Sequence, residues 1–76
     1  MTQIQDLTAR QIHDIRRRRL AAFVVLQDFG RVRLVSVAVW TMHGDWITVK
    51  HYDGERIGEC QHIARVPIDT DVEFSP

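Results

Sequence analysis

Residues 20–52 carry the strongest strand signal in the chain and read LAAFVVLQDFGRVRLVSVAVWTMHGDWITVKHY. It holds three runs rich in β-branched and aromatic residues, the composition typical of strands, at 20–27, 32–41 and 46–52. The segments between these runs, 28–31 and 42–45, each contain a glycine, which suits a turn that needs a positive φ. This succession predicts an antiparallel β meander whose strands are joined by short turns.

The meander is expected to continue directly after this stretch. Asp53-Gly54 is a strong signal for a two-residue hairpin, and a short return strand would then occupy residues 56–60. Residues 61–64 are expected to form a helical turn rather than a strand.

The last part of the chain is expected to contribute little to the sheet. Residues 65–68 are interpreted as an edge strand, where Pro67 is tolerated because an edge position need not donate a hydrogen bond. The acidic segment 69–76 is expected to be a frayed tail.

The segment before the meander carries the signal of a helix start. Thr8 and Gln11 have the spacing of a capping box, in which each side chain accepts a hydrogen bond from the backbone N–H of the other residue. The helix is expected over about 8–19, because the residues that follow are strong strand formers. A helix that continues to Leu26 is the alternative, since apolar residues keep a helical spacing up to that point.

Together these elements predict a single α+β domain over residues 1–76. An N-terminal helix (about 8–19) precedes a four- to five-stranded antiparallel meander (about 20–68) and the acidic tail (69–76). This order resembles the outline of SH3-like and Sm-like barrels, so closure into a small barrel that hides the strand edges is one expected form. A 76-residue chain buries only about 60% of its unfolded surface, so we expect its stability to be marginal unless a partner chain adds to it.

The composition excludes several classes of protein. With 45% hydrophobic and 26% charged residues, the chain has the composition of a folded domain rather than a disordered one. Its longest apolar runs fall short of the ~20 residues that span a bilayer, so no membrane segment is expected. The single cysteine, Cys60, rules out an intrachain disulfide and favours the cytoplasm.

Charge is unevenly divided along the chain, although the net charge is zero. Residues 1–38 hold seven arginines against three aspartates, and residues 39–76 hold three basic against seven acidic residues. The arginines that are candidates for binding phosphate groups are Arg16, Arg17, Arg18, Arg19, Arg31 and Arg33. They make a nucleic-acid-binding domain the alternative function. The competing interpretation is a solvated helix end, where cations meet the negative end of the helix dipole.

An expected aromatic surface favours protein binding. Along the strand at 46–52, the side chains of Trp46, Lys50 and Tyr52 alternate onto one face. Trp and Tyr are frequent anchors of protein interfaces. These three residues are therefore our candidate partner-binding site, and the alternative is that the two aromatic rings belong to the core.

Histidine and cysteine residues suggest a third hypothesis, a zinc-stabilised module. His51, Cys60 and His62 would lie on neighbouring strands, although their spacing matches no standard zinc motif. The sequence shows no glycine-rich phosphate loop and no established pairing of a nucleophile with a base, so we assign no catalytic residues. We expect neither enzymatic activity nor a cofactor.

The leading hypothesis is a small, non-enzymatic and cytoplasmic module that binds a protein, as an accessory, regulatory or inhibitory factor. Homo-oligomerisation, most simply as a homodimer, is a further option for such a small domain. The nucleic-acid-binding domain is the second hypothesis and the zinc-stabilised module the third.

Overall fold

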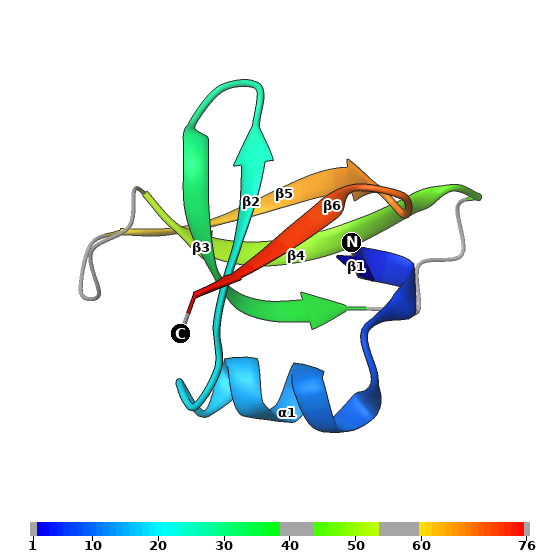
Figure 1. Ribbon diagram of the computed structural model, residues 1–76. Helices are drawn as coiled ribbons and strands as arrows, with labels where there is room; N and C mark the ends of the chain where they lie inside the picture. Colours follow the sequence, from blue (N-terminus) through cyan, green and yellow to red (C-terminus); the bar gives the residue numbers. More distant parts are fainter. Residues whose placement is uncertain (1, 39–43, 54–59, 76) are drawn as a thin grey trace.

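Figure 1 shows one bent antiparallel sheet with a short helix below it. The computed structural model describes residues 2–38, 44–53 and 60–75. Its elements are β1 (Thr2–Gln3), the 3-10 helix η1 (Ile4–Asp6), α1 (Ala9–Arg16), β2 (Ala21–Leu26), β3 (Gly30–Ala38), β4 (Trp46–Tyr52), β5 (Gln61–Pro67) and β6 (Asp71–Ser75). The described strands lie in the order β1-β6-β2-β3-β4-β5, and all neighbours are antiparallel. The α+β class is thus confirmed, although a strand precedes the helix.

α1 begins as the sequence predicts. The Thr8 hydroxyl accepts a hydrogen bond from the N–H of Gln11 at 3.1 Å, and the Gln11 side chain accepts one from the N–H of Thr8 at 2.9 Å. This reciprocal pair is a complete capping box. It satisfies two backbone donors that would otherwise lack a partner at the helix start, so the local sequence alone fixes this boundary.

α1 ends earlier than expected. Arg18 has a φ of 60°, in the left-handed region. Its N–H donates to the carbonyl of Ile15, and the N–H of Arg19 donates to the carbonyl of Asp14. These two bonds form a Schellman motif, a common way for a helix to end. The helix therefore stops at Arg16, and the longer alternative is wrong.

β2 and β3 form the hairpin that the sequence predicts. Leu26 pairs with Gly30, which leaves residues 27–29 as the turn. Gly30 has a φ of 69°, as expected for a glycine that closes a three-residue hairpin loop. The strand that was expected up to residue 41 is described as far as Ala38, and residues 39–43 lie outside the described residues.

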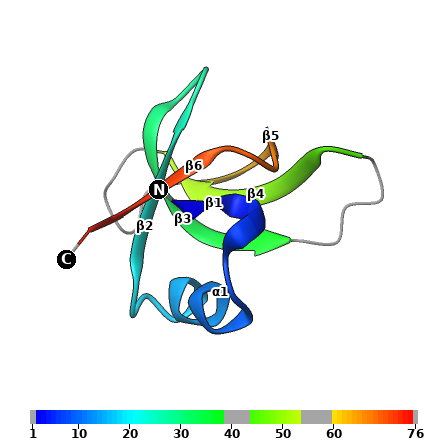
Figure 2. The same ribbon diagram turned by 45° about the vertical axis from the view of Figure 1, so that its right-hand side comes forward.

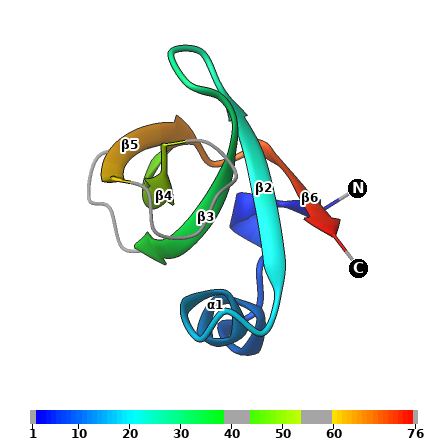
Figure 3. The same cartoon turned by 90° about the vertical axis from the view of Figure 1, so that its left-hand side faces the viewer.

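β3 belongs to two ladders and bends between them. Residues 30–33 pair with β2, whereas residues 34–38 pair with β4. The register shifts between Leu34 and Ser36. An irregularity of this kind bends a strand and increases its twist. Figures 1 and 3 show β3 curving away from β2 to run beside β4, so the sheet curls over its own inner face.

β4 has the predicted bounds, but the chain after it differs from the prediction. Tyr52 pairs with Gln61, so residues 53–60 connect β4 to β5 and the expected two-residue hairpin is wrong. Residues 54–59 lie outside the described residues, together with most of the expected return strand. The helical turn expected at 61–64 is also wrong, because this segment pairs with β4 along its whole length.

The acidic tail is a strand rather than a frayed end. Residues 73–75 of β6 pair with β2, and residues 71–72 pair with β1. Val72 is 2% exposed and Phe74 packs against the core, while Asp71 and Glu73 face solvent. This alternation of acidic and apolar residues has the period of a half-buried strand. The stability gained by burying the apolar side chains therefore outweighs the tendency of the acidic residues to keep this segment in solvent.

The core lies between the inner face of the curled sheet and α1. Its most deeply buried aliphatic side chains come from η1, α1 and four strands, and they are Ile4, Ile15, Ala22, Val24, Val32, Leu34, Val49 and Val72. β1 and β5 are the outer strands, and no ladder joins them in the ranges that the structure describes. None of the described helices is long and apolar enough to cross a membrane.

The role of β6 can be tested with two neighbouring substitutions. Val72→Ala should lower the free energy of unfolding by about 2 kcal/mol, because it removes buried methyl groups and leaves a cavity. Asp71→Ala alters an exposed side chain and should change it by no more than about 0.5 kcal/mol. Urea denaturation followed by circular dichroism measures both values. Equal, small effects would mean that the C-terminal segment is frayed after all.

Candidate interaction surface

The exposed side of the β4–β5 ribbon is the first part of the candidate surface. In an antiparallel ladder, directly paired residues present their side chains on the same face. Trp46 pairs with Pro67, Thr48 with Arg65, and Lys50 with Ile63. These three pairs form the outer β4–β5 face, made up of Trp46, Thr48, Lys50, Ile63, Arg65 and Pro67. On the opposite face of the ribbon, Ile47, Val49 and Val66 are buried in the core.

The outer β4–β5 face combines apolar side chains with positive charge. Ile63 is 72% exposed and Trp46 is 44% exposed. The guanidinium carbon of Arg65 lies 6.0 Å from the centroid of the Trp46 ring, in reach of a cation–π interaction. Lys50 is the second cation, and none of the six residues is acidic. The face is therefore suited to an apolar partner that carries negative charge.

A groove beside this face is the second part of the surface. The edge groove, with a volume of about 340 Å³, runs between residues 25–29 of the β2–β3 hairpin and residues 64–67 of β5. Figure 2 shows the hairpin projecting beyond the rest of the sheet. Three of the four large hydrophobic side chains that are exposed in the described part of the chain line the groove, and they are Val25, Phe29 and Trp46.

Phe29 anchors the tip of the hairpin to the inner face of the ribbon. Its ring centroid lies 5.0 Å from that of His51 and 4.8 Å from that of His62. His51 is fully buried, and its Nδ1 donates a hydrogen bond to the carbonyl oxygen of Tyr52 at 3.0 Å. Aromatic contacts at these distances add to the stability gained from burial alone. They hold the hairpin beside β5, so the edge groove is part of the fold.

The aromatic pair expected at Trp46 and Tyr52 is divided between surface and core. Tyr52 is 2% exposed, and its hydroxyl accepts a hydrogen bond from the guanidinium of Arg18. The same guanidinium lies over the Tyr52 ring, with its carbon 5.7 Å from the ring centroid. Trp46 and Lys50 lie on the outer β4–β5 face, and their contact with a partner stays a prediction. Tyr52 instead connects the helix end to β4.

The six candidate arginines do not form one continuous patch of unpaired side chains. Arg16, Arg17 and Arg19 are exposed around the Schellman turn, while Arg18 bonds to Tyr52. On β3, Arg31 forms an ion pair with Glu73 at 3.3 Å and lies 3.8 Å from the centroid of the Phe23 ring. Arg33 is half-buried on the same strand. Two of the six guanidinium groups thus have partners within the fold.

The histidine pair lies side by side, as the sequence suggested, but not in the arrangement of metal ligands. His51 pairs with His62 across β4 and β5, and Cys60 is exposed just before β5. The two rings are nearly parallel, at 27°, with their centroids 5.6 Å apart. Ligands of one zinc ion must converge to about 2.0–2.1 Å from it, which stacked rings do not do. The described residues contain no group of three possible ligands.

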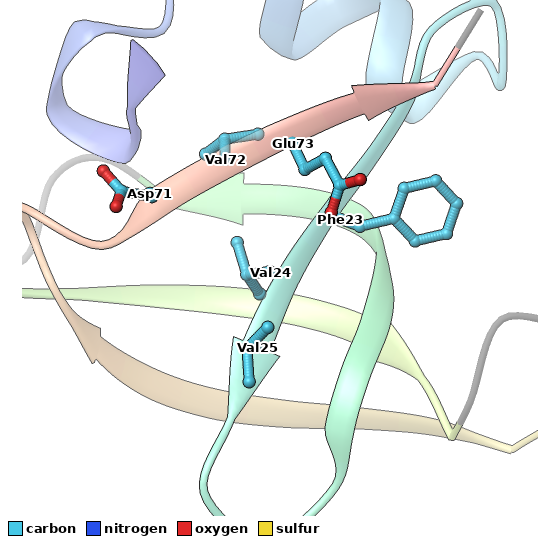
Figure 4. A pocket seen from close by; sticks show the side chains of 6 residues that line it. All are labelled: Phe23, Val24, Val25, Asp71, Val72 and Glu73. Atoms are coloured by element: carbon cyan, nitrogen blue, oxygen red, sulfur yellow. The ribbon is translucent and has the colours of Figure 1, made fainter. Parts of the chain in front are cut away.

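A smaller cavity of about 210 Å³ lies where β6 leaves β2 to pair with β1. Figure 4 shows its lining, in which Val24, Val25 and Val72 accompany the carboxylates of Asp71 and Glu73. Glu73 is already paired with Arg31. With few polar groups directed at a common point, this cavity does not have the features of a ligand site.

The link between Arg18 and Tyr52 can be measured as a coupling energy. Tyr52→Phe removes the acceptor of the hydrogen bond, and Arg18→Ala removes the donor. A double-mutant cycle of unfolding free energies should give a coupling of about 0.5–1.5 kcal/mol. Strictly additive effects of the two substitutions would show that this contact contributes nothing to stability.

Comparison with known proteins yields no relative from which a role could be transferred. No protein-family model matches the chain, and neither does a curated protein or a solved structure.

Proposed function

We propose that the chain is a small, non-enzymatic module that binds a protein partner through the outer β4–β5 face and the adjoining edge groove. The observation that carries the proposal is the position of the exposed hydrophobic side chains. Val25, Phe29 and Trp46 line the edge groove, and Ile63 lies on the strand beside it. Exposed hydrophobic groups gathered in one region mark interaction surfaces more often than scattered ones do.

The chemistry of the surface supports the same proposal. Trp and Arg are enriched among the residues that contribute most to protein interfaces. Here Trp46 and Arg65 lie within cation–π distance, and Lys50 adds a second positive charge to the same face. A partner that covers these groups would also bury Ile63. That burial would add stability to a domain too small to have a large core of its own.

The curl of the sheet supports a finer description of the fold. We propose that the sheet is an incompletely closed barrel of the SH3-like or Sm-like outline. In this description the edge groove takes the place of a closing ladder between the hairpin and β5.

One observation favours nucleic-acid binding as the second candidate. Arg16, Arg17 and Arg19 are exposed together at the end of α1, where they could contact phosphate groups. This site is distinct in sequence and in structure from the outer β4–β5 face, so substitutions can separate the two functions.

Matched arginine substitutions test the proposed function. Arg65→Ala and Trp46→Ala should each lower the amount of partner protein captured from a lysate about tenfold, because they remove interface anchors. Arg17→Ala removes an exposed cation outside the surface and should leave capture unchanged. Quantitative mass spectrometry of the captured protein measures the effect, and thermal unfolding confirms that each variant is folded.

The opposite pattern would contradict the proposal. If Arg17→Ala abolishes binding while Arg65→Ala and Trp46→Ala do not, the helix end is the binding site. Fluorescence anisotropy with a labelled oligonucleotide would then be expected to show binding that weakens steeply as salt is added.

A further inference from the structure

We infer that the partner contributes an extended segment, with alternating acidic and apolar residues, that adds as a further strand along the free edge of β5. This inference rests on the proposed function and specifies how the surface recognises its partner. Strand addition of this kind gains affinity from backbone hydrogen bonds and specificity from the alternate side chains.

The edge of β5 is open in the part of the chain that the structure describes. β5 is the last strand of the sheet, and its only described ladder is the one with β4. Figure 3 shows β5 at the outer margin of the sheet. An unpaired strand edge presents a row of backbone donors and acceptors to any chain that can pair with it.

Two hydrogen bonds just outside the strand establish which backbone groups point outward. The N–H of Asp53 donates to the carbonyl of Cys60 at 2.9 Å, and the N–H of Ile68 donates to the carbonyl of Asp45 at 2.8 Å. In an antiparallel ladder, hydrogen-bonded pairs recur at every second residue. Both bonds assign the same alternate residues of β5 to pairing with β4.

It follows that even-numbered residues of β5 direct their backbone groups toward β4. The residues whose N–H and C=O groups point to the free edge are therefore Gln61, Ile63 and Arg65. Pro67 occupies the next outward position, and having no N–H it offers only an acceptor there. The usable edge is the half of β5 that contains Ile63, the most exposed large hydrophobic residue described.

The charge of the outer β4–β5 face specifies one side of the added strand. Lys50 and Arg65 lie on either side of Ile63 on this face, as a cross-strand and a same-strand neighbour, and no acidic residue accompanies them. Side chains of an added strand that point to this face would lie beside Arg65, with Lys50 one strand further away. Acidic residues at these positions are favoured by charge complementarity.

The edge groove specifies the other side of the added strand. Side chains that alternate to the inner face would enter the space between β5 and the hairpin, whose apolar lining includes Val25, Leu26, Phe29, Ala64 and Val66. Apolar residues are favoured there by burial. A second copy of the chain pairing through its own β5 would satisfy the backbone groups, but β5 itself contains no acidic residue to place against Lys50 and Arg65. The observations therefore favour an acidic partner segment over self-association.

The test uses a capped peptide of alternating glutamate and valine as the probe, with an alternating lysine–valine peptide as its charge control. Binding is followed by NMR titration of the intact ¹⁵N-labelled protein. The glutamate peptide should shift the amide signals of Ile63 and Arg65 and should bind at least about tenfold more tightly than the lysine peptide.

Two substitutions at one position separate the backbone from the side chain. Ile63→Pro removes an outward N–H while leaving the hydrogen bonds to β4 intact, and it should weaken binding of the glutamate peptide about tenfold. Ile63→Thr keeps the N–H and a β-branched side chain, and it should cost no more than about threefold. If both variants bind the glutamate peptide like the original protein, strand addition along β5 is wrong.

Two further outcomes would also overturn the inference, and they are distinguishable from failure of the proposed function. Concentration-dependent dimerisation that Ile63→Pro abolishes would make a second copy the occupant of the edge. Absence of peptide binding, while Arg65→Ala still loses the captured protein, would leave the surface as an interface but exclude this mode of recognition. If the glutamate peptide does not bind and Arg65→Ala also leaves capture of the partner protein unchanged, the proposed function is wrong as well.

Discussion

The bend in β3 determines how the two halves of the sheet lie relative to one another. The first half of β3 pairs with β2 and its second half pairs with β4. The change of register between Leu34 and Ser36 separates these two ladders. Without the bend, β4 and β5 would extend a flat sheet away from β2. With it, the ribbon turns back toward the hairpin, which allows Phe29 to contact His51 and His62.

This geometry explains why the candidate surface exists at all. The curl brings β5 close to the β2–β3 hairpin but leaves a groove instead of a ladder between them. Val25, Phe29 and Trp46 therefore line an open groove rather than a packed interior, and Ile63 lies exposed on the strand beside it. A partner that covers these side chains can recover the free energy lost by leaving this hydrophobic surface in water.

Local signals in the sequence predicted the elements that local interactions determine. The capping box at Thr8, the glycine turn at Gly30 and the strand from Trp46 to Tyr52 are all confirmed. The failures have two physical causes. α1 ends at a local Schellman turn in which an arginine takes the left-handed conformation, which a non-glycine residue seldom adopts. β6 forms because β1 and β2, which are distant in sequence, pair with it.

The candidate surface was predicted only in part, because contacts distant in sequence complete it. Alternation along β4 placed Trp46 and Lys50 on one face, but it could not reveal that Arg18 covers Tyr52. Ile63 was missed because residues 61–64 were interpreted as a helical turn, and Arg65, at the start of the expected edge strand, was not paired with β4 for the same reason. The signal was present in residues 61–67, where His, Ala and Val alternate with more exposed residues in the period of a strand.

Amide hydrogen exchange measured by NMR tests whether β5 has a free edge. Amides bonded to a neighbouring strand exchange slowly, whereas those that face solvent exchange rapidly. We expect an alternating pattern along β5, with His62, Ala64 and Val66 protected and Ile63 and Arg65 exchanging rapidly. Protection of Ile63 and Arg65 equal to that of their neighbours would show that the edge is already covered, and strand addition along β5 would then be wrong.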